Sequence, residues 1–292
     1  MGMRMGAMAA MDDDLDVDAS ELVVRRPRFP FADGLRADWN PRLPEFAYAA
    51  NAVSMLMPYA EPYFCRSVRA VMDDLPEGLQ PVAEDYVRQE ASHHAQHRRF
   101  NDVITEGHPM MKRLERRIGG VYTWFERHSS KRLNMAFAAG SEAIAFGLAR
   151  WTEGHLDELF EGADPVARDL YWWHLAEEVE HKSVAFDVYA EVDGSKLRYT
   201  FGMCLSLVLL GIFVALNTMV MLVASRRVFN PVSWFRLTKW ALSMVWKVFP
   251  ELAVSVLPSH HPSKLTDPIY LTTWLRAFDP ETASVPSLTA LD

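Results

Sequence analysis

The sequence holds little cysteine, because Cys65 and Cys204 are the only two among its 292 residues. Both lie in apolar stretches, so the fold does not depend on a framework of disulfides, and a reducing compartment fits the chain. There is also no arginine-rich patch interleaved with aromatic residues and no zinc-finger spacing, and the formal net charge is −8, so we expect no nucleic-acid partner. The first twenty residues contain the acidic run Asp12–Asp14 instead of an apolar core, so we expect no signal peptide.

Strand-like alternation is absent as well, and clusters of Gly and Pro are few and well separated. Hydrophobic spacing instead predicts four long helices, near 44–74, 79–106, 119–156 and 164–192. The third helix could be divided from the segment that precedes it, and Pro58 and Pro62 predict a kink in the first. Four long helices with short connections are typical of a four-helix bundle. We therefore expect an all-α protein in which a mobile N-terminal arm, residues 1–40, precedes a bundle at 41–195.

Charged residues are missing from one long stretch, residues 199–225. At roughly 27 residues this run exceeds the ~20 that are needed to cross the core of a bilayer. Cations stand at both of its ends, namely Lys196, Arg198, Arg226 and Arg227. A helix buried in the bundle is the alternative, but a run that is apolar on all faces and bounded by cations favours a membrane-embedded helix.

The next stretch, residues 230–257, is apolar but not free of charge. It carries three tryptophans among three cations, namely Trp234, Trp240, Trp246, Arg236, Lys239 and Lys247. This composition favours a helix at the membrane interface, although a hairpin of two crossings stays open. We therefore expect residues 196–292 to form hydrophobic membrane-associated helices and a C-terminal tail, with the bundle facing the cytoplasm. The same surface could instead bind a second copy of the chain in a homodimer.

The fourth predicted helix contains the stretch "WWHLAEEVEHKSVAFDVY". His174, Glu178 and His181 are spaced i, i+4 and i+7, so they lie on one face of that helix. Burying an ionised carboxylate is costly unless it has a partner, and a metal ion bound by carboxylate and neutral imidazoles removes that cost. The pattern therefore favours a metal site over a solvated helix face. We assign the solvated face of this helix to three other residues, Glu177, Glu180 and Lys182.

The second predicted helix contains "RQEASHHAQH", in which Glu90 and His93 form another Glu-x-x-His. One copy of this motif is weak evidence, but two copies on two helices separated by a third are much more specific. His97 continues the same face at i+7. It could be a further ligand or a polar residue at the mouth of a pocket, and we favour a third role, in which it holds a metal ligand from behind.

In di-metal carboxylate bundles two helices each give a Glu-x-x-His, and the other two helices each give one glutamate. The first predicted helix has Glu61 in the apolar stretch "MLMPYAEPYFCRSV". The third has Glu142 in "NMAFAAGSEAIAFGLA". Both glutamates stand where this pattern requires them.

The order Glu61, Glu90-x-x-His93, Glu142, Glu178-x-x-His181 is similar to that of the ferritin-like non-haem di-iron carboxylate superfamily, over residues 44–192. A third histidine four residues before the last motif is typical of p-aminobenzoate N-oxygenase-type enzymes. The stretch "EEVEHKSVAFDVY" also resembles a bacterial family called "predicted metal-dependent hydrolase". The hydrophobic segment after residue 195 departs from the soluble N-oxygenases.

The resemblance implies a ferritin-like four-helix bundle and a di-metal site whose seven ligands are Glu61, Glu90, His93, Glu142, His174, Glu178 and His181. It assigns no catalytic residue beyond these ligands. It also implies two iron ions that use O2 to hydroxylate, desaturate or N-oxygenate a substrate. A ferredoxin or a reductase must then supply electrons, because the sequence has no flavin or nicotinamide fingerprint.

The apolar segment suggests a hydrophobic, lipid-like substrate. The same ligands could instead hold a Mn or Zn pair that hydrolyses ester or phosphate bonds. A non-catalytic, metal-storing or metal-binding protein is a third alternative.

Overall fold

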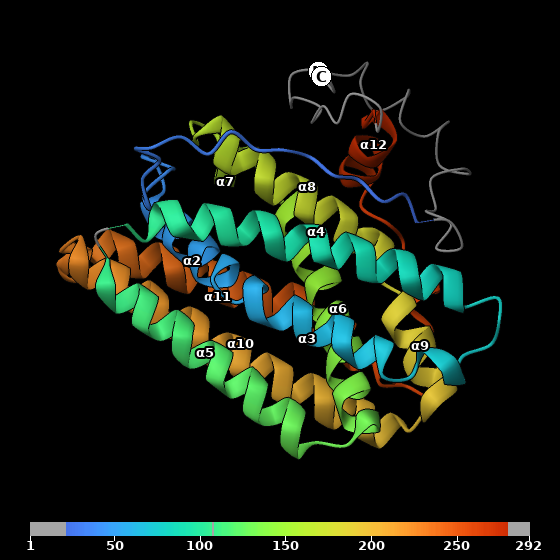
Figure 1. Ribbon diagram of the computed structural model, residues 1–292. Helices are drawn as coiled ribbons and strands as arrows, with labels where there is room; N and C mark the ends of the chain where they lie inside the picture. Colours follow the sequence, from blue (N-terminus) through green and yellow to red (C-terminus); the bar gives the residue numbers. More distant parts are fainter. Residues whose placement is uncertain (1–21, 107, 280–292) are drawn as a thin grey trace.

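The computed structural model describes residues 22–106 and 108–279, which form helices and no β-strand (Figure 1). The all-α fold predicted from the sequence is confirmed. The principal helices are α2 (Pro44–Ser54), α3 (Met57–Arg69), α4 (Gln80–Ile104), α5 (Pro109–His128), α6 (Lys131–Glu153), α7 (Leu156–Phe160), α8 (Pro165–His181), α9 (Val184–Val192), α10 (Lys196–Ala224), α11 (Pro231–Ser255) and α12 (Ile269–Ala277).

Three of the predicted long helices are interrupted. The first divides after Ser54. Pro58 lies in the first turn of α3, where proline is tolerated because a backbone N–H in that turn has no partner within the helix. The predicted helix at 119–156 is wrong in extent, because this region contains two helices: α5 begins earlier, at Pro109, and α6 begins after Ser130. The side chain of Ser130 caps α6 by accepting a hydrogen bond from a backbone N–H of its first turn. The fourth divides after His181 into α8 and α9.

The bundle that contains the predicted site is formed by α3, α4, α6 and α8. Helix α4 packs along α3, α6 packs against α8 and α9, and a single large apolar core joins them. On the other side, α10 packs along α6 and α2, and α5 lies beside α3 and α10 (Figure 1). Helix α11 also rests on α6. Helix α6 therefore lies between the bundle interior and the two hydrophobic helices.

The segment before α2 is extended and crosses the outside of the bundle near α4 and α8 (Figure 1). Side chains of α4 donate hydrogen bonds to its backbone carbonyls at Val23, Pro27 and Phe29. Phe29 is buried and contacts the ring of Trp173. Residues 22–40 of the predicted arm are thus held against the bundle, whereas residues 1–21 lie outside the described part of the chain. The division of the chain into three parts stays a prediction.

Among the described residues, α10 is the one helix that is long and apolar enough to cross a membrane. Of its most apolar 18 residues, 28% are buried within the molecule. It is therefore neither a fully buried core helix nor a helix that is free on all sides.

Two glycines allow α10 to approach α6 closely. A Cβ added to Gly202 would lie 2.7 Å from the backbone of Ala136, and one added to Gly140 would lie 2.5 Å from the Cα atom of Met203. Real Cβ atoms do not approach backbone atoms so closely, so any side chain at either position would push the two helices apart.

We expect Gly202→Ala to destabilise the protein by about 2 kcal/mol, because a methyl group there meets backbone and not a movable side chain. Gly211→Ala is the matched control on the same helix, since nothing lies within 4 Å of its added Cβ. That control should be neutral or slightly stabilising through helix propensity. Thermal unfolding of both variants measures the difference, and equal melting temperatures would contradict the close approach.

Candidate metal centre

The structure brings all seven predicted ligands together inside the bundle. Glu61 comes from α3, Glu142 from α6, one Glu-x-x-His from α4 and the other from α8. Ligand atoms converge in two groups, and within each group they all lie within 4.8 Å of one another. The first group consists of Glu90, His93, Glu178 and His181. The second consists of Glu61, His174 and again His93. The remaining residue, Glu142, has its Oε2 3.8 Å from Nδ1 of His181. The assignment of these side chains as ligands stays a prediction.

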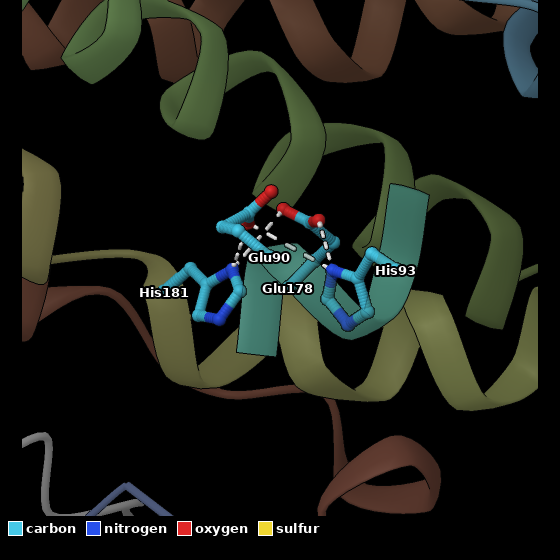
Figure 2. Close-up of side chains that lie close together, drawn as sticks. All are labelled: Glu90, His93, Glu178 and His181. Atoms are coloured by element: carbon cyan, nitrogen blue, oxygen red, sulfur yellow. Dashed lines mark ion pairs between the residues drawn. The ribbon is translucent and has the colours of Figure 1, made fainter. Parts of the chain in front are cut away.

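The two Glu-x-x-His motifs face each other across the site. Figure 2 shows His93 and His181 directing one ring nitrogen each toward the carboxylates of Glu90 and Glu178. Nδ1 of His181 lies 2.9 Å from Oε1 of Glu90, and Nδ1 of His93 lies 3.8 Å from an oxygen of each glutamate. His174 adds its Nε2 at 2.7 Å from Glu178 and at 3.4 Å from Glu61.

These side chains fit a cation because their polar atoms are buried without hydrogen-bond partners. The buried atoms without such a partner include both carboxylate oxygens of Glu61 and of Glu90, Oε2 of Glu142, and Nδ1 of His93 and of His181. Leaving so many polar atoms unsatisfied in the interior is costly, and bound metal ions would satisfy them. Four carboxylates also match the charge of two divalent ions. The chain therefore contains a buried His/Glu metal-binding site.

Outer contacts fix which nitrogen of His93 and of His181 faces the site. Nε2 of His93 lies 2.8 Å from a carboxylate oxygen of Glu177, which can only accept a hydrogen bond. Nε2 of His181 lies 2.7 Å from Oε1 of Gln89. The amide nitrogen of Gln89 donates to Val23 and to Glu180, so its oxygen accepts from the imidazole. In both neutral imidazoles the proton is thus on Nε2, and the lone pair of Nδ1 is directed inward.

His174 is oriented by a chain of three polar residues, His97, Ser54 and Asn101. Its Nδ1 lies 2.7 Å from Nε2 of His97, and Nδ1 of His97 lies 2.8 Å from the hydroxyl of Ser54. That hydroxyl donates to the side-chain oxygen of Asn101, so it accepts from His97. His97 in turn accepts from Nδ1–H of His174, which leaves Nε2 of His174 as the inward lone pair. The structure thus places His97 directly behind His174, in the position that the favoured interpretation requires.

One part of the sequence analysis is wrong. Glu177, Glu180 and Lys182 do not form a solvated face, because none of them is more than 4% exposed. From Leu170 to His181 every residue of α8 is buried except Leu175, which is half-buried, so this part of the helix is enclosed by protein on all sides. Trp172 and Trp173, which precede these charges, and Val179, which lies among them, carried that signal.

The buried acids of α8 are neutralised by Arg25, which the sequence analysis missed. This arginine comes from the extended segment, is 4% exposed, and pairs with Glu180 at 2.8 Å and with Glu177 at 3.3 Å. Glu177 contacts His93, and Glu180 contacts Gln89 behind His181. A single guanidinium therefore stands behind both Glu-x-x-His histidines.

Burial raises the pKa of Glu61 and of Glu142 well above the ordinary carboxyl value of 4.5, and the neighbouring glutamates raise each further. Tyr86 donates a hydrogen bond of 2.6 Å to Glu142, and burial raises the pKa of that phenol too. Against the effect of burial, Glu177 raises the pKa of His93 and Glu90 raises that of His181. Without metal, the site therefore favours the protonated forms of these groups.

A family model described as "predicted metal-dependent hydrolase" matches residues 23–266, which is most of the chain. The chain belongs to this family. The match begins at the extended segment that carries Arg25 and continues past the bundle through α10 and α11. No curated protein and no solved structure matches the chain. The resemblance to this family that the sequence suggested is confirmed, and the oxidative or hydrolytic nature of its chemistry is not decided by it.

We expect Arg25→Met to weaken metal retention about 10- to 100-fold, the usual range for groups that hold metal ligands from behind. Glu177 and Glu180 would lose their buried counter-charge and could no longer hold their partners in place. Arg26→Met is the matched control, because that neighbouring side chain is exposed. Competition with a chelator measures retention, and equal retention in the two variants would show that Arg25 does not support the site.

The metal-free protein is expected to lose stability as the pH rises above the ordinary carboxyl pKa of 4.5. The folded state keeps protons on Glu61 and Glu142 that the unfolded chain has released, so folding becomes less favourable as those protons leave. From that pH upward, the free energy of unfolding should fall by up to ~1.4 kcal/mol per pH unit for each proton that only the folded state retains. Denaturant unfolding of metal-free and metal-loaded protein tests this, since bound metal should remove the dependence.

Proposed function

We propose that the protein is a membrane-associated di-iron oxidoreductase that uses O2 to oxidise a hydrophobic, lipid-like substrate. The observation that carries this proposal is the set of buried, partnerless carboxylate oxygens and imidazole nitrogens that converge from four helices. Carboxylate and histidine ligands without a thiolate suit iron that reacts with O2. A pair of iron ions bound there would pass electrons to O2 and deliver the resulting oxidising power to a substrate.

The chain itself supplies orientation, charge and exclusion of water. The outer hydrogen bonds of Glu177, Gln89 and His97 hold the three imidazoles with their lone pairs inward. Glu61, Glu90 and the histidines of both motifs are at most 1% exposed, so bulk water does not reach them. O2 is small and apolar, and a closed site of this kind suits it.

Tyr86 is placed to hold or move a proton at the site. Its hydroxyl donates to Oε1 of Glu142, and its ring packs edge-on against His181. As the phenol is fully buried, its proton can pass only to this carboxylate or to a molecule bound beside it. We propose that electrons come from a separate protein such as a ferredoxin or a reductase, and that the bundle faces the cytoplasm.

Hydrolysis is the second candidate, and the family description favours it. Zinc or manganese ions held by the same residues would activate water against an ester or phosphate bond. A phosphate, however, needs cationic side chains that face the metals. The Arg and Lys side chains that are buried in the described part of the chain, Arg25 and Lys182, are already engaged by Glu180 and Asp267. This arrangement disfavours a phosphate substrate, and the oxidative alternative needs no such cations.

The test is elemental analysis of the purified protein, followed by anaerobic reduction and rapid mixing with O2. We expect about two iron ions per chain and a transient visible absorption with consumption of O2. Glu178→Ala should lower both the iron content and the O2 consumption while the helical signal survives, because this residue contacts His174 and both Glu-x-x-His histidines. Zinc or manganese that is inert to O2 would favour hydrolysis instead.

A further inference from the structure

We infer that α10 and α11 together form one apolar face that lies flat in the surface of an anionic lipid bilayer, with α10 parallel to the membrane plane. This inference deepens the membrane association proposed above and rests on it. It replaces the crossing helix expected from the length of α10 alone with a helix that is only half immersed.

Large apolar side chains form a row along the outer side of α10. They recur at helical spacing and include Leu197 (82% exposed), Phe201 (57%), Val208 (55%), Ile212 (50%), Leu216 (48%) and Val223 (56%). The opposite side of the helix is buried against α6 and α2. Both sides of α10 are apolar, but only one is covered by protein, so the outer row has no partner among the described residues.

Helix α11 continues the same face. Its exposed row consists of Phe235 (70%), Leu242 (65%), Trp246 (83%) and Phe249 (47%). The C-terminal end of α11 meets the start of α10, where the hydroxyl of Ser255 contacts the sulfur of Met203 at 3.5 Å. Both helices rest on α6, because Gly140 lies against Met203 and Gly147 against Val248. Their outer rows therefore both point away from α6.

Charge identifies the partner as an anionic lipid surface. Residues 196–257 carry seven Lys and Arg residues and a single acid, Glu251, in a chain whose net charge is −8. Four of the seven pair with acids elsewhere in the chain, which leaves Lys196, Arg226 and Lys247 for headgroups. Helix α5 lies beside α10 and adds a row of exposed cations, namely Lys112, Arg113, Arg116 and Arg117. A tryptophan-bearing apolar face bordered by cations binds anionic headgroups. Two copies of this face would instead place like charges opposite each other.

The packing of α5 against α10 favours the flat orientation. Phe213, near the middle of α10, belongs to the same apolar cluster as Ile118 and Tyr122 of α5. If α10 crossed the bilayer, its middle would lie near the centre of the hydrocarbon and would bring Arg116 and Arg117 with it. Charged side chains are strongly disfavoured there, whereas in the flat orientation they lie at the level of the headgroups.

The proposed face is separated from the metal centre by one helix. The hydroxyl of Ser141 on α6 contacts that of Ser206 on α10 at 2.7 Å, and the next residue, Glu142, points into the metal centre. A hydrophobic substrate taken from the bilayer would therefore have to pass only the layer formed by α6 and its neighbours.

The test measures the depth of three positions along the outer row of α10. Phe201→Cys, Ile212→Cys and Val223→Cys are made in a Cys204→Ser background, in which the remaining cysteine, Cys65, is buried. Each variant carries a fluorescent label, is bound to vesicles that contain anionic lipid, and is quenched by lipids brominated at known depths. Equal, shallow depths are expected. A much deeper label at position 212 would mean that α10 crosses the bilayer, and labels that lipid does not quench would mean that another chain covers the face.

Binding itself has a matched control. Phe235→Ser and Trp246→Ser should each weaken binding to anionic vesicles at least tenfold, whereas Val23→Ser, in the extended segment, and Ile269→Ser, at the start of α12, should not, although both positions are exposed and apolar. The extended segment and α12 lie across the bundle from α10 (Figure 1). Equal weakening in all four would overturn the inference. Metal content and O2 consumption are measured in the same samples, so that a failure of membrane binding is distinguished from a failure of the proposed chemistry.

Discussion

A cluster of four glutamates in one buried interior is the constraint on which this structure depends. Ionised carboxylates in such a place are stable only beside counter-charges, and the arrangement of the surrounding helices answers that need. Helices α4 and α8 bring the imidazoles, while α3 and α6 each bring one carboxylate. Behind the histidines stands a further set of polar groups, so that the site consists of an inner group aimed at a cation and an outer group that fixes its orientation.

The sequence predicts the inner group well because its chemistry is tied to helical spacing. Glu90 and His93, and Glu178 and His181, stand one turn apart, so any helical fold presents each pair on one face. Glu61 and Glu142 were found as isolated acids in apolar stretches, and both lie in the interior. The all-α class could be predicted equally well, because the sequence lacks strand-like alternation.

The outer group was not predictable, because it joins residues that are distant in the sequence. Arg25 lies in a segment without helical periodicity, and nothing in its local sequence indicates that it is buried beside α8. Glu177 and Glu180 were misassigned because charged residues were expected to lie on a solvated face. The position of the break between α5 and α6 was predicted wrongly for a different reason. The two helices are joined by only two residues, and neither this short link nor the cap supplied by Ser130 changes the hydrophobic pattern much.

The contact between Arg25 and Glu180 also has a consequence for the order in which the chain acquires its structure. The two residues are 155 positions apart, so a growing chain emerging from the ribosome presents the arginine long before its partners exist. Contacts of such long range form late, because the entropy of closing the intervening loop must first be overcome by other packing. The bundle helices therefore have to associate before the extended segment can settle on them. Until then α4 and α8 lack the cover that this segment provides.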